Sequence, residues 1–214
     1  FAKKKGLNII VSDRSKKAPA IKLCDSFVNA SVYDPIKILK ILRKSYKGKI
    51  NGVMSLSSDV PLTVSYLTKK FKTHGYSMLA AQILSDKYRM KNFFKNNNIR
   101  TPNYFLIKNY NEFKKKIHFS DKTVLKPIDS RGARGVFLIK KNYKNLKSLF
   151  LRSLKESKKK KLLLEEFISG QQLSTETVIL NKKAYTVGIS DRNYDKLEVL
   201  FPNIIENGSD LPSK

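Results

Sequence analysis

The alternation of short apolar runs with helix-forming segments is the feature that most restricts the fold of this chain. Gly6–Val11 (GLNIIV), Phe27–Val28 and Gly52–Leu56 (GVMSL) are brief apolar runs of the kind that form buried strands. Two other segments open with helix-starting residues, at Asp34–Pro35 and Val60–Pro61, because Asp caps a helix and Pro fits its first turn. Strands that alternate with helices predict a parallel α/β sheet for this part of the chain.

The pattern changes near Ser85, where Ser85 or Asp86 can cap a helix that runs to about Asn96. This helix is expected to bury its apolar residues, Tyr88, Met90, Phe93 and Phe94. The strands expected beyond it are Asn103–Ile107, Thr123–Pro127, Val136–Ile139, Leu162–Phe167, Leu173–Leu180 and Ala184–Asp191. The helices expected between them are Asn111–Ile117 and Tyr143–Leu154. The change of pattern predicts a domain boundary between residues 84 and 85.

Composition favours a globular protein without a membrane segment. Apolar residues make up 41% of the 214 residues, and no apolar stretch approaches the roughly 20 residues that span a bilayer. The single cysteine, Cys24, cannot form an internal disulfide, which fits a reducing compartment. We therefore expect a cytoplasmic protein.

The net charge of +27 raises the alternative of a nucleic-acid-binding protein. Of the 44 basic residues only 8 are Arg, although Arg is the preferred bidentate reader of phosphates and guanine. The Lys residues are spread along the whole chain instead of forming one basic arm. Compositional bias therefore explains the charge better than a nucleic-acid surface does, and nucleic-acid binding is kept as an alternative.

The segment VLKPIDSRGARGVFLI combines a strand-end lysine with a glycine-bearing loop. Lys126 lies near the end of an apolar strand, which would hold its ammonium group rigidly. Glycines allow backbone N–H groups to approach phosphate oxygens, and such loops bind anions. The residues expected to form a phosphate-covering loop are Ser130, Arg131, Gly132, Ala133, Arg134 and Gly135. A plain β-hairpin whose turn contains glycine is the alternative for this segment.

Two further segments carry candidate nucleotide contacts. In LLLEEFISG, Glu165 emerges from a buried strand and could accept the adenine amino group, while the backbone of Glu166 and Ile168 could bind the purine edge beside Phe167. Solvated acids at a strand end are the alternative. In SDKYRMKNFFKNNNIRTP, Lys87 lies in the first turn of a helix, where the helix dipole disfavours a cation. This small cost hints at a use for Lys87 outside the helix.

Taken together, the order of these segments resembles the ATP-grasp superfamily, in particular the branch that contains biotin carboxylase and the carbamoyl-phosphate synthase large chain. The matching segments are Asp86–Lys87, Asn98–Pro102, Lys126–Pro127, Gly132–Gly135 and Glu165–Gly170. The segment before them resembles the Rossmann-like domain that precedes the grasp in this family. The resemblance implies an α/β protein: a Rossmann-like parallel-sheet domain over residues 1–84, then an incomplete α+β ATP-grasp domain over residues 85–214. Residues 85–163 would form its lid and residues 164–214 the start of its larger subdomain.

The resemblance also implies roles for individual residues. Lys87 and Lys126 would neutralise the ATP phosphates, the loop from Ser130 to Gly135 would fold over them, and Glu165 would hold the adenine amino group. Gln172 stands where the family often has a ribose-binding Glu, and Glu176 matches an acidic position that faces the active site.

Mg²⁺ is implied as well, held in the family by a Glu and a Glu-x-Asn segment. No such segment occurs before Lys214, and neither Glu198 nor Glu206 is a convincing substitute. We expect a fragment truncated at both ends, with its Mg²⁺ ligands beyond Lys214 and no turnover of its own, and we assign no catalytic residue. His74 and His118 stand alone and predict no metal site.

For the intact protein the resemblance implies an ATP-dependent carboxylate–amine (carbon–nitrogen) ligase that works through an acyl phosphate. Its partners would be ATP, a small carboxylate and an amine, with no membrane; the oligomeric state is left open, with a homodimer as one option. A non-catalytic nucleotide-binding module is the second hypothesis, and a basic nucleic-acid-binding protein is the third.

Overall fold

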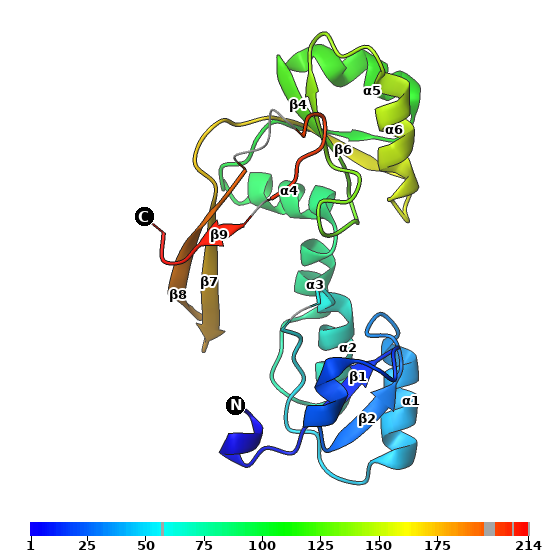
Figure 1. Cartoon of the computed structure of the whole chain (residues 1–214), viewed down its shortest axis with the longest axis vertical. Helices are drawn as coiled ribbons and strands as arrows, with labels where there is room; N and C mark the ends of the chain where they lie inside the picture. The colour runs from blue at the N-terminus through cyan, green and yellow to red at the C-terminus, as the bar shows by residue number, and fades with distance from the viewer. Residues whose placement is uncertain (57, 195–199, 207, 214) are drawn as a thin grey trace. The chain divides into compact units, whose positions relative to one another are not determined.

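The computed structural model describes residues 1–56, 58–194, 200–206 and 208–213 (Figure 1). The chain divides into two compact units, Phe1–Arg89 and Met90–Lys214. The division falls inside helix α4 (Lys87–Asn96). None of the helices in the described part of the chain has the length and apolar character needed to cross a membrane.

The first unit is a small α/β body. Its strands β1 (Ile10–Asp13) and β2 (Ser26–Asn29) pair in parallel, with Ile10 opposite Ser26. The remaining elements are two 3₁₀ turns, Lys3–Lys5 and Pro19–Leu23, and three helices, α1 (Pro35–Ser45), α2 (Pro61–Phe71) and α3 (Met78–Leu84). The buried apolar cluster consists of Val28, Ala30, Ile38, Leu39, Leu42 and Leu67. The parallel pairing and the two helices predicted at Asp34–Pro35 and Val60–Pro61 are confirmed.

Three details of the first unit differ from the prediction. The expected strand Gly52–Leu56 does not form: Leu56 is 90% exposed, and Ser55 Oγ donates to the carbonyl of Ser58 in a local turn, so only Val53 packs against the core. The first strand starts at Ile10 and not at Gly6, which is the left-handed cap of the Lys3–Lys5 turn. Helix α3 was not predicted.

The second unit contains a four-stranded antiparallel sheet. Its strands are β3 (Tyr104–Ile107), β4 (Lys122–Pro127), β5 (Phe137–Lys140) and β6 (Leu162–Glu166), in the order β3-β6-β4-β5. Strand β6 therefore lies between β3 and β4 and hydrogen-bonds to both. All four strands and helices α5 (Tyr110–Lys116), continued by a 3₁₀ turn over Ile117–Phe119, and α6 (Leu146–Lys155) lie close to their predicted positions. The predicted α/β class is confirmed.

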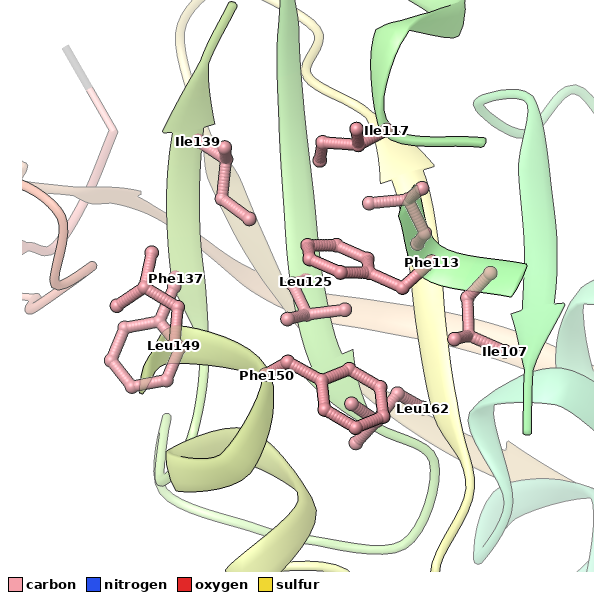
Figure 2. Packing of buried hydrophobic residues seen from close by; sticks show 10 residues of the cluster. Ile107, Phe113, Ile117, Leu125, Phe137, Ile139, Leu149, Phe150 and Leu162 are labelled. Carbon is pink, nitrogen blue, oxygen red and sulfur yellow. The ribbon is translucent and has the colours of Figure 1, made fainter. Parts of the chain in front are cut away.

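Helices α5 and α6 cover one face of this sheet (Figure 2). Phe113 from α5 and Phe150 from α6 face Leu125 of β4. The ring centroids of Phe113 and Phe150 are 5.6 Å apart. Leu162 and Leu164 of β6 belong to the same buried cluster. Because side chains alternate along a strand, the residues between these positions point to the opposite face.

The last part of the unit is a second antiparallel sheet, β7 (Leu173–Leu180), β8 (Lys183–Arg192) and β9 (Ser209–Asp210). The β7–β8 hairpin turns through Asn181 and Lys182, both with positive φ, at 50° and 64°. Two consecutive left-handed residues are the signature of a type I′ turn, which favours Asn followed by Gly. The two strands expected over Leu173–Leu180 and Ala184–Asp191 form this hairpin, and Lys182 occupies the glycine position of its turn.

Lys182→Gly is expected to stabilise the second unit by about 0.5–1 kcal/mol, because it removes the steric cost of a left-handed non-glycine residue. Urea unfolding followed by circular dichroism measures the change. Lys183→Gly, one residue later and inside β8, is the matched control and is expected to destabilise the unit. A Lys182→Gly variant that unfolds more easily than the parent chain would contradict the turn assignment.

Candidate functional site

The face of the four-stranded sheet away from α5 and α6 carries the predicted nucleotide residues. Leu162, Leu164 and Leu125 point into the helix-covered core, so Glu165 of β6 and Lys126 of β4 point to the other face. The register places Glu165 opposite Val124, so that Lys126 stands two residues along the neighbouring strand. The sheet register itself therefore brings the predicted Lys126 and Glu165 together.

A buried ion cluster forms where a third residue, Lys91 of α4, meets this pair. The Nζ of Lys126 contacts Oε1 of Glu165, and the Nζ of Lys91 lies 2.7 Å from Oε2. The side chains of Lys91, Glu165 and Lys126 are only 7%, 9% and 20% exposed. The Lys91 ammonium also donates to Thr101 Oγ1 at 2.8 Å and lies 5.7 Å from the ring centroid of Tyr104. One carboxylate thus bridges two ammonium groups in a largely dry environment.

The electrostatics of the cluster are unbalanced. Burial lowers the pKa of Lys91, the contact with Glu165 raises it, and the nearby Lys126 charge lowers it further, with a net decrease from 10.5. Glu165 Oε2 is buried and has no hydrogen bond of good geometry among the described residues, so the ion contact with Lys91 is its compensation. Two cations facing one anion leave an excess positive charge that suits a polyanionic ligand.

Lys91 was not singled out from the sequence; Lys87 was named, and it stays a predicted phosphate contact. Lys87 begins α4 one helical turn before Lys91 and belongs to the first compact unit. The available signal was helical spacing: Lys91 lies three residues after Tyr88 and three before Phe94, both expected on the apolar face. A lysine on an apolar helix face needs a buried partner, and here that partner is Glu165.

The glycine-bearing loop between β4 and β5 has a left-handed backbone at three positions. Gly132, Ala133 and Gly135 have φ values of 61°, 53° and 71°. Ser130 Oγ donates to the Arg134 carbonyl at 2.9 Å, and Arg134 Nε donates to the Arg131 carbonyl at 3.1 Å. Hydrogen bonds within the loop therefore stabilise its conformation.

The other predicted nucleotide contacts in and after β6 are not part of the ion cluster. The side chain of Glu166 accepts from the backbone N–H and the amide Nδ2 of Asn103, at 3.3 and 3.0 Å, and so ties β6 to the chain before β3. Phe167 donates its N–H to the Lys122 carbonyl, and Ile168 is exposed. The Gln172 carbonyl accepts from the Arg192 N–H at 2.9 Å.

Glu176 lies opposite Gly188 in the β7–β8–β9 sheet, whereas Lys126 and Glu165 lie in the four-stranded sheet.

A cleft of about 780 Å³ adjoins the loop. Its walls combine Gly132–Gly135 with residues from α6, from the end of β8 and from the chain after β8. The charged residues in the walls are Arg134, Arg152, Lys155, Glu156, Arg192 and Glu206. Arg192 forms an ion pair with Glu206, which lowers the pKa of that carboxyl group. Lys91, Lys126 and Glu165 do not line this cleft.

Metal ligands are not gathered in the described residues. No group of three or more His, Cys, Asp or Glu side chains within residues 1–56, 58–194, 200–206 and 208–213 could hold a metal ion. Glu206 is engaged by Arg192, and Glu198 lies outside the described residues.

The lowered pKa of Lys91 predicts how stability changes at alkaline pH. The unfolded chain keeps the ordinary value of 10.5, so between the lowered value and 10.5 it binds more protons than the folded chain. The contribution of Lys91 to the free energy of unfolding therefore rises with pH inside that window and is constant below it. Urea unfolding measures the free energy of unfolding of the parent chain and of Lys91→Met from pH 7 to 10.5. The value for the parent minus that for the variant should increase as the pH approaches 10.5. A difference that stays constant or falls would contradict the cause given for the shift.

The two loop glycines are expected to respond differently to substitution. A Cβ at Gly132 would meet no atom within 4 Å, whereas one at Gly135 would lie 3.0 Å from Pro127 Cγ and 3.1 Å from Glu156 Cβ. Gly132→Ala is expected to cost about 1–2 kcal/mol for its positive φ alone. Gly135→Ala is expected to cost about 1–3 kcal/mol more, because the packing must also shift. Equal losses in denaturant unfolding would show that the close approach at Gly135 is unimportant.

Comparisons with known proteins identify the family of this chain. The family model described as "ATP-grasp domain" matches residues 84–210, and the model described as "PylC-like, N-terminal domain" matches residues 1–79. A D-alanine–D-alanine ligase from Wolbachia pipientis wMel is 28% identical over 121 residues, which cover 56% of this chain and 37% of the ligase.

Solved structures resemble the chain over most of its length. An L-amino acid ligase from Bacillus licheniformis superposes with a TM-score of 0.75 at 16% identity, covering 100% of this chain and 50% of that one. Biotin carboxylase from Campylobacter jejuni superposes with a TM-score of 0.67 at 18% identity, covering 89% and 47%. At these identities the likeness concerns the fold, and the chain spans about half the length of these proteins. Because the domain model covers more than half of its residues, the chain belongs to the ATP-grasp family.

Proposed function

We propose that this chain is the ATP-binding portion of an ATP-dependent carboxylate–amine ligase. The observation that carries the proposal is the buried cluster in which Lys91 and Lys126 share the carboxylate of Glu165. Buried charges are costly, and a site that keeps two cations against one anion is suited to a ligand that brings negative charge. Membership of a family whose matched relatives include ligases supports the same conclusion.

The groups present fit a nucleoside triphosphate. The two ammonium groups would bind phosphate oxygens by charge-assisted hydrogen bonds. A carboxylate oxygen can accept more than one hydrogen bond, so the buried Oε2 of Glu165, which lies 2.7 Å from Lys91 Nζ, could also accept one from an adenine amino group. The left-handed loop from Ser130 to Gly135 would present backbone N–H groups to the phosphates, with Arg131 and Arg134 adding charge. Lys87, Glu166, Phe167, Ile168, Gln172 and Glu176 remain proposed contacts.

In the proposed reaction ATP supplies the phosphoryl group that activates a substrate carboxylate as an acyl phosphate, which an amine then captures. The residues of this chain would bind and orient the nucleotide and offset the charge on the transferred group. We assign none of the described residues to Mg²⁺ binding, since no ligand set is present among them. We also propose a division into residues 1–84 and 85–214, which the family matches over residues 1–79 and 84–210 support. Within the second part, residues 85–163 would be the lid.

Lys126→Ala and Lys91→Ala are each expected to weaken ATP binding by about 10- to 100-fold, because each removes one charge-assisted contact. Isothermal titration of the chain with ATP at fixed salt measures the effect. Lys95→Ala, an exposed lysine on the same helix as Lys91, is the matched control and should bind ATP as the parent chain does. Parent-like binding by a folded Lys126→Ala variant would overturn the site assignment.

Turnover separates a ligase from a non-catalytic nucleotide-binding module. ADP release by the whole protein, screened against amino acids and small carboxylates in the presence of amines, should depend on one particular carboxylate. ATP binding without substrate-dependent ADP release would favour the non-catalytic module.

A further inference from the structure

We propose that Glu165 makes phosphate binding depend on adenine, so that the site rejects polyphosphates that lack an amino-purine. This inference rests on the proposed function and adds a specificity role to one residue of the same site. The Glu165 carboxylate contacts both of the lysines that would bind phosphate. A ligand must therefore displace an internal anion before it can reach them.

The displaced anion cannot move into water easily. Glu165 lies on β6, the strand held by both neighbours in the sheet, and its side chain is 9% exposed. Lys91 is similarly fixed, since its ammonium is anchored by Thr101 as well as by Glu165. The three charged groups are thus held close together by the sheet and by α4, and an entering phosphate would stand beside the carboxylate.

A phosphate without a base leaves Glu165 in an unfavourable state. Its lysine contacts would be shared with the ligand, and a buried carboxylate without partners costs far more than an exposed one. The carboxylate would also repel the phosphate charge at short range, where screening by salt is weak. Inorganic tripolyphosphate is therefore expected to bind poorly despite the two lysines.

Adenine removes this penalty. A carboxylate is an acceptor only, and the exocyclic amino group of adenine is a donor that can replace the lost lysine contacts. Guanine and hypoxanthine carry a carbonyl acceptor at that position, which would face the carboxylate unfavourably. The site is therefore expected to select amino-purine triphosphates, with Glu165 acting both for adenine and against other polyanions.

The first test compares the dissociation constants of tripolyphosphate and ATP, by isothermal titration at fixed ionic strength and fixed magnesium. Glu165→Gln keeps the shape of the side chain and removes its charge. We expect the variant to bind tripolyphosphate at least about tenfold more tightly than the parent chain, so that its preference for ATP shrinks. Glu112→Gln, the same charge change on α5, is the control and should keep the parent preference. A folded Glu165→Gln variant with the parent preference overturns the proposal.

The second test uses the unaltered chain and so does not depend on the folding of a variant. If adenine engages Glu165 and frees the lysines, free adenine should tighten tripolyphosphate binding by about tenfold. Hypoxanthine, which differs by a carbonyl in place of the amino group, should have no such effect. Equal effects of the two bases, or none from adenine, overturn the proposal.

The two proposals fail in different ways. Absence of ATP binding by the unaltered chain would refute the proposed nucleotide site. ATP binding that is intact, together with tripolyphosphate binding that is indifferent to Glu165 and to adenine, would refute only the role given to Glu165.

Discussion

The ion cluster of Lys91, Glu165 and Lys126 is the interaction on which the candidate site depends. Three charges held away from water would be destabilising unless each had a partner, and here each of the two ammonium groups contacts one oxygen of the single carboxylate. Replacing such a cluster by apolar side chains is often neutral or stabilising, so its presence is poorly explained by stability alone. A role in binding a charged ligand explains both the burial and the excess of positive charge.

The antiparallel register of the four-stranded sheet makes that cluster possible. Strand β6 lies between β3 and β4, so Glu165 is flanked by backbone on both sides and cannot shift without breaking two ladders. The helices α5 and α6 bury the opposite face through Leu125, Leu162 and Leu164, which fixes which residues of each strand face the cluster. A slip of one residue would move Lys126 and Glu165 into the apolar core.

Sequence reasoning recovered the fold of the second unit because strand alternation, loop glycines and helix caps all indicated the same elements. Asp86 does cap α4, accepting from the N–H groups of Tyr88 and Arg89. The prediction of a strand over Gly52–Leu56 was wrong, because this apolar run has no neighbouring strand to pair with among the described residues. Pairing partners are set by tertiary structure and not by the local sequence pattern.

The same limit explains why Lys91 was not predicted. The motif resemblance pointed to the lysine that follows Asp86, whereas the buried lysine is defined by its partner Glu165, which lies 74 residues further along the chain. Lys126 and Glu165 could be predicted because each stands at the end of a buried strand, where the chain direction alone limits the position of the side chain. The pairing across the sheet could not be predicted, because it depends on the strand order β3-β6-β4-β5.

The high net positive charge of the chain does not by itself let the site distinguish one polyanionic ligand from another. A chain with a charge of +27 attracts every polyanion by long-range electrostatics, and this attraction carries no chemical selectivity. More lysines in the pocket would strengthen the binding of ATP, RNA and inorganic polyphosphate alike. In the role that we propose for Glu165, a buried carboxylate between the two lysines would weaken the binding of all of these ligands except one that brings it a hydrogen-bond donor. The proposed selectivity therefore depends on where an acidic group is buried, and Glu165 is one of the very few acidic side chains buried in the described part of the chain.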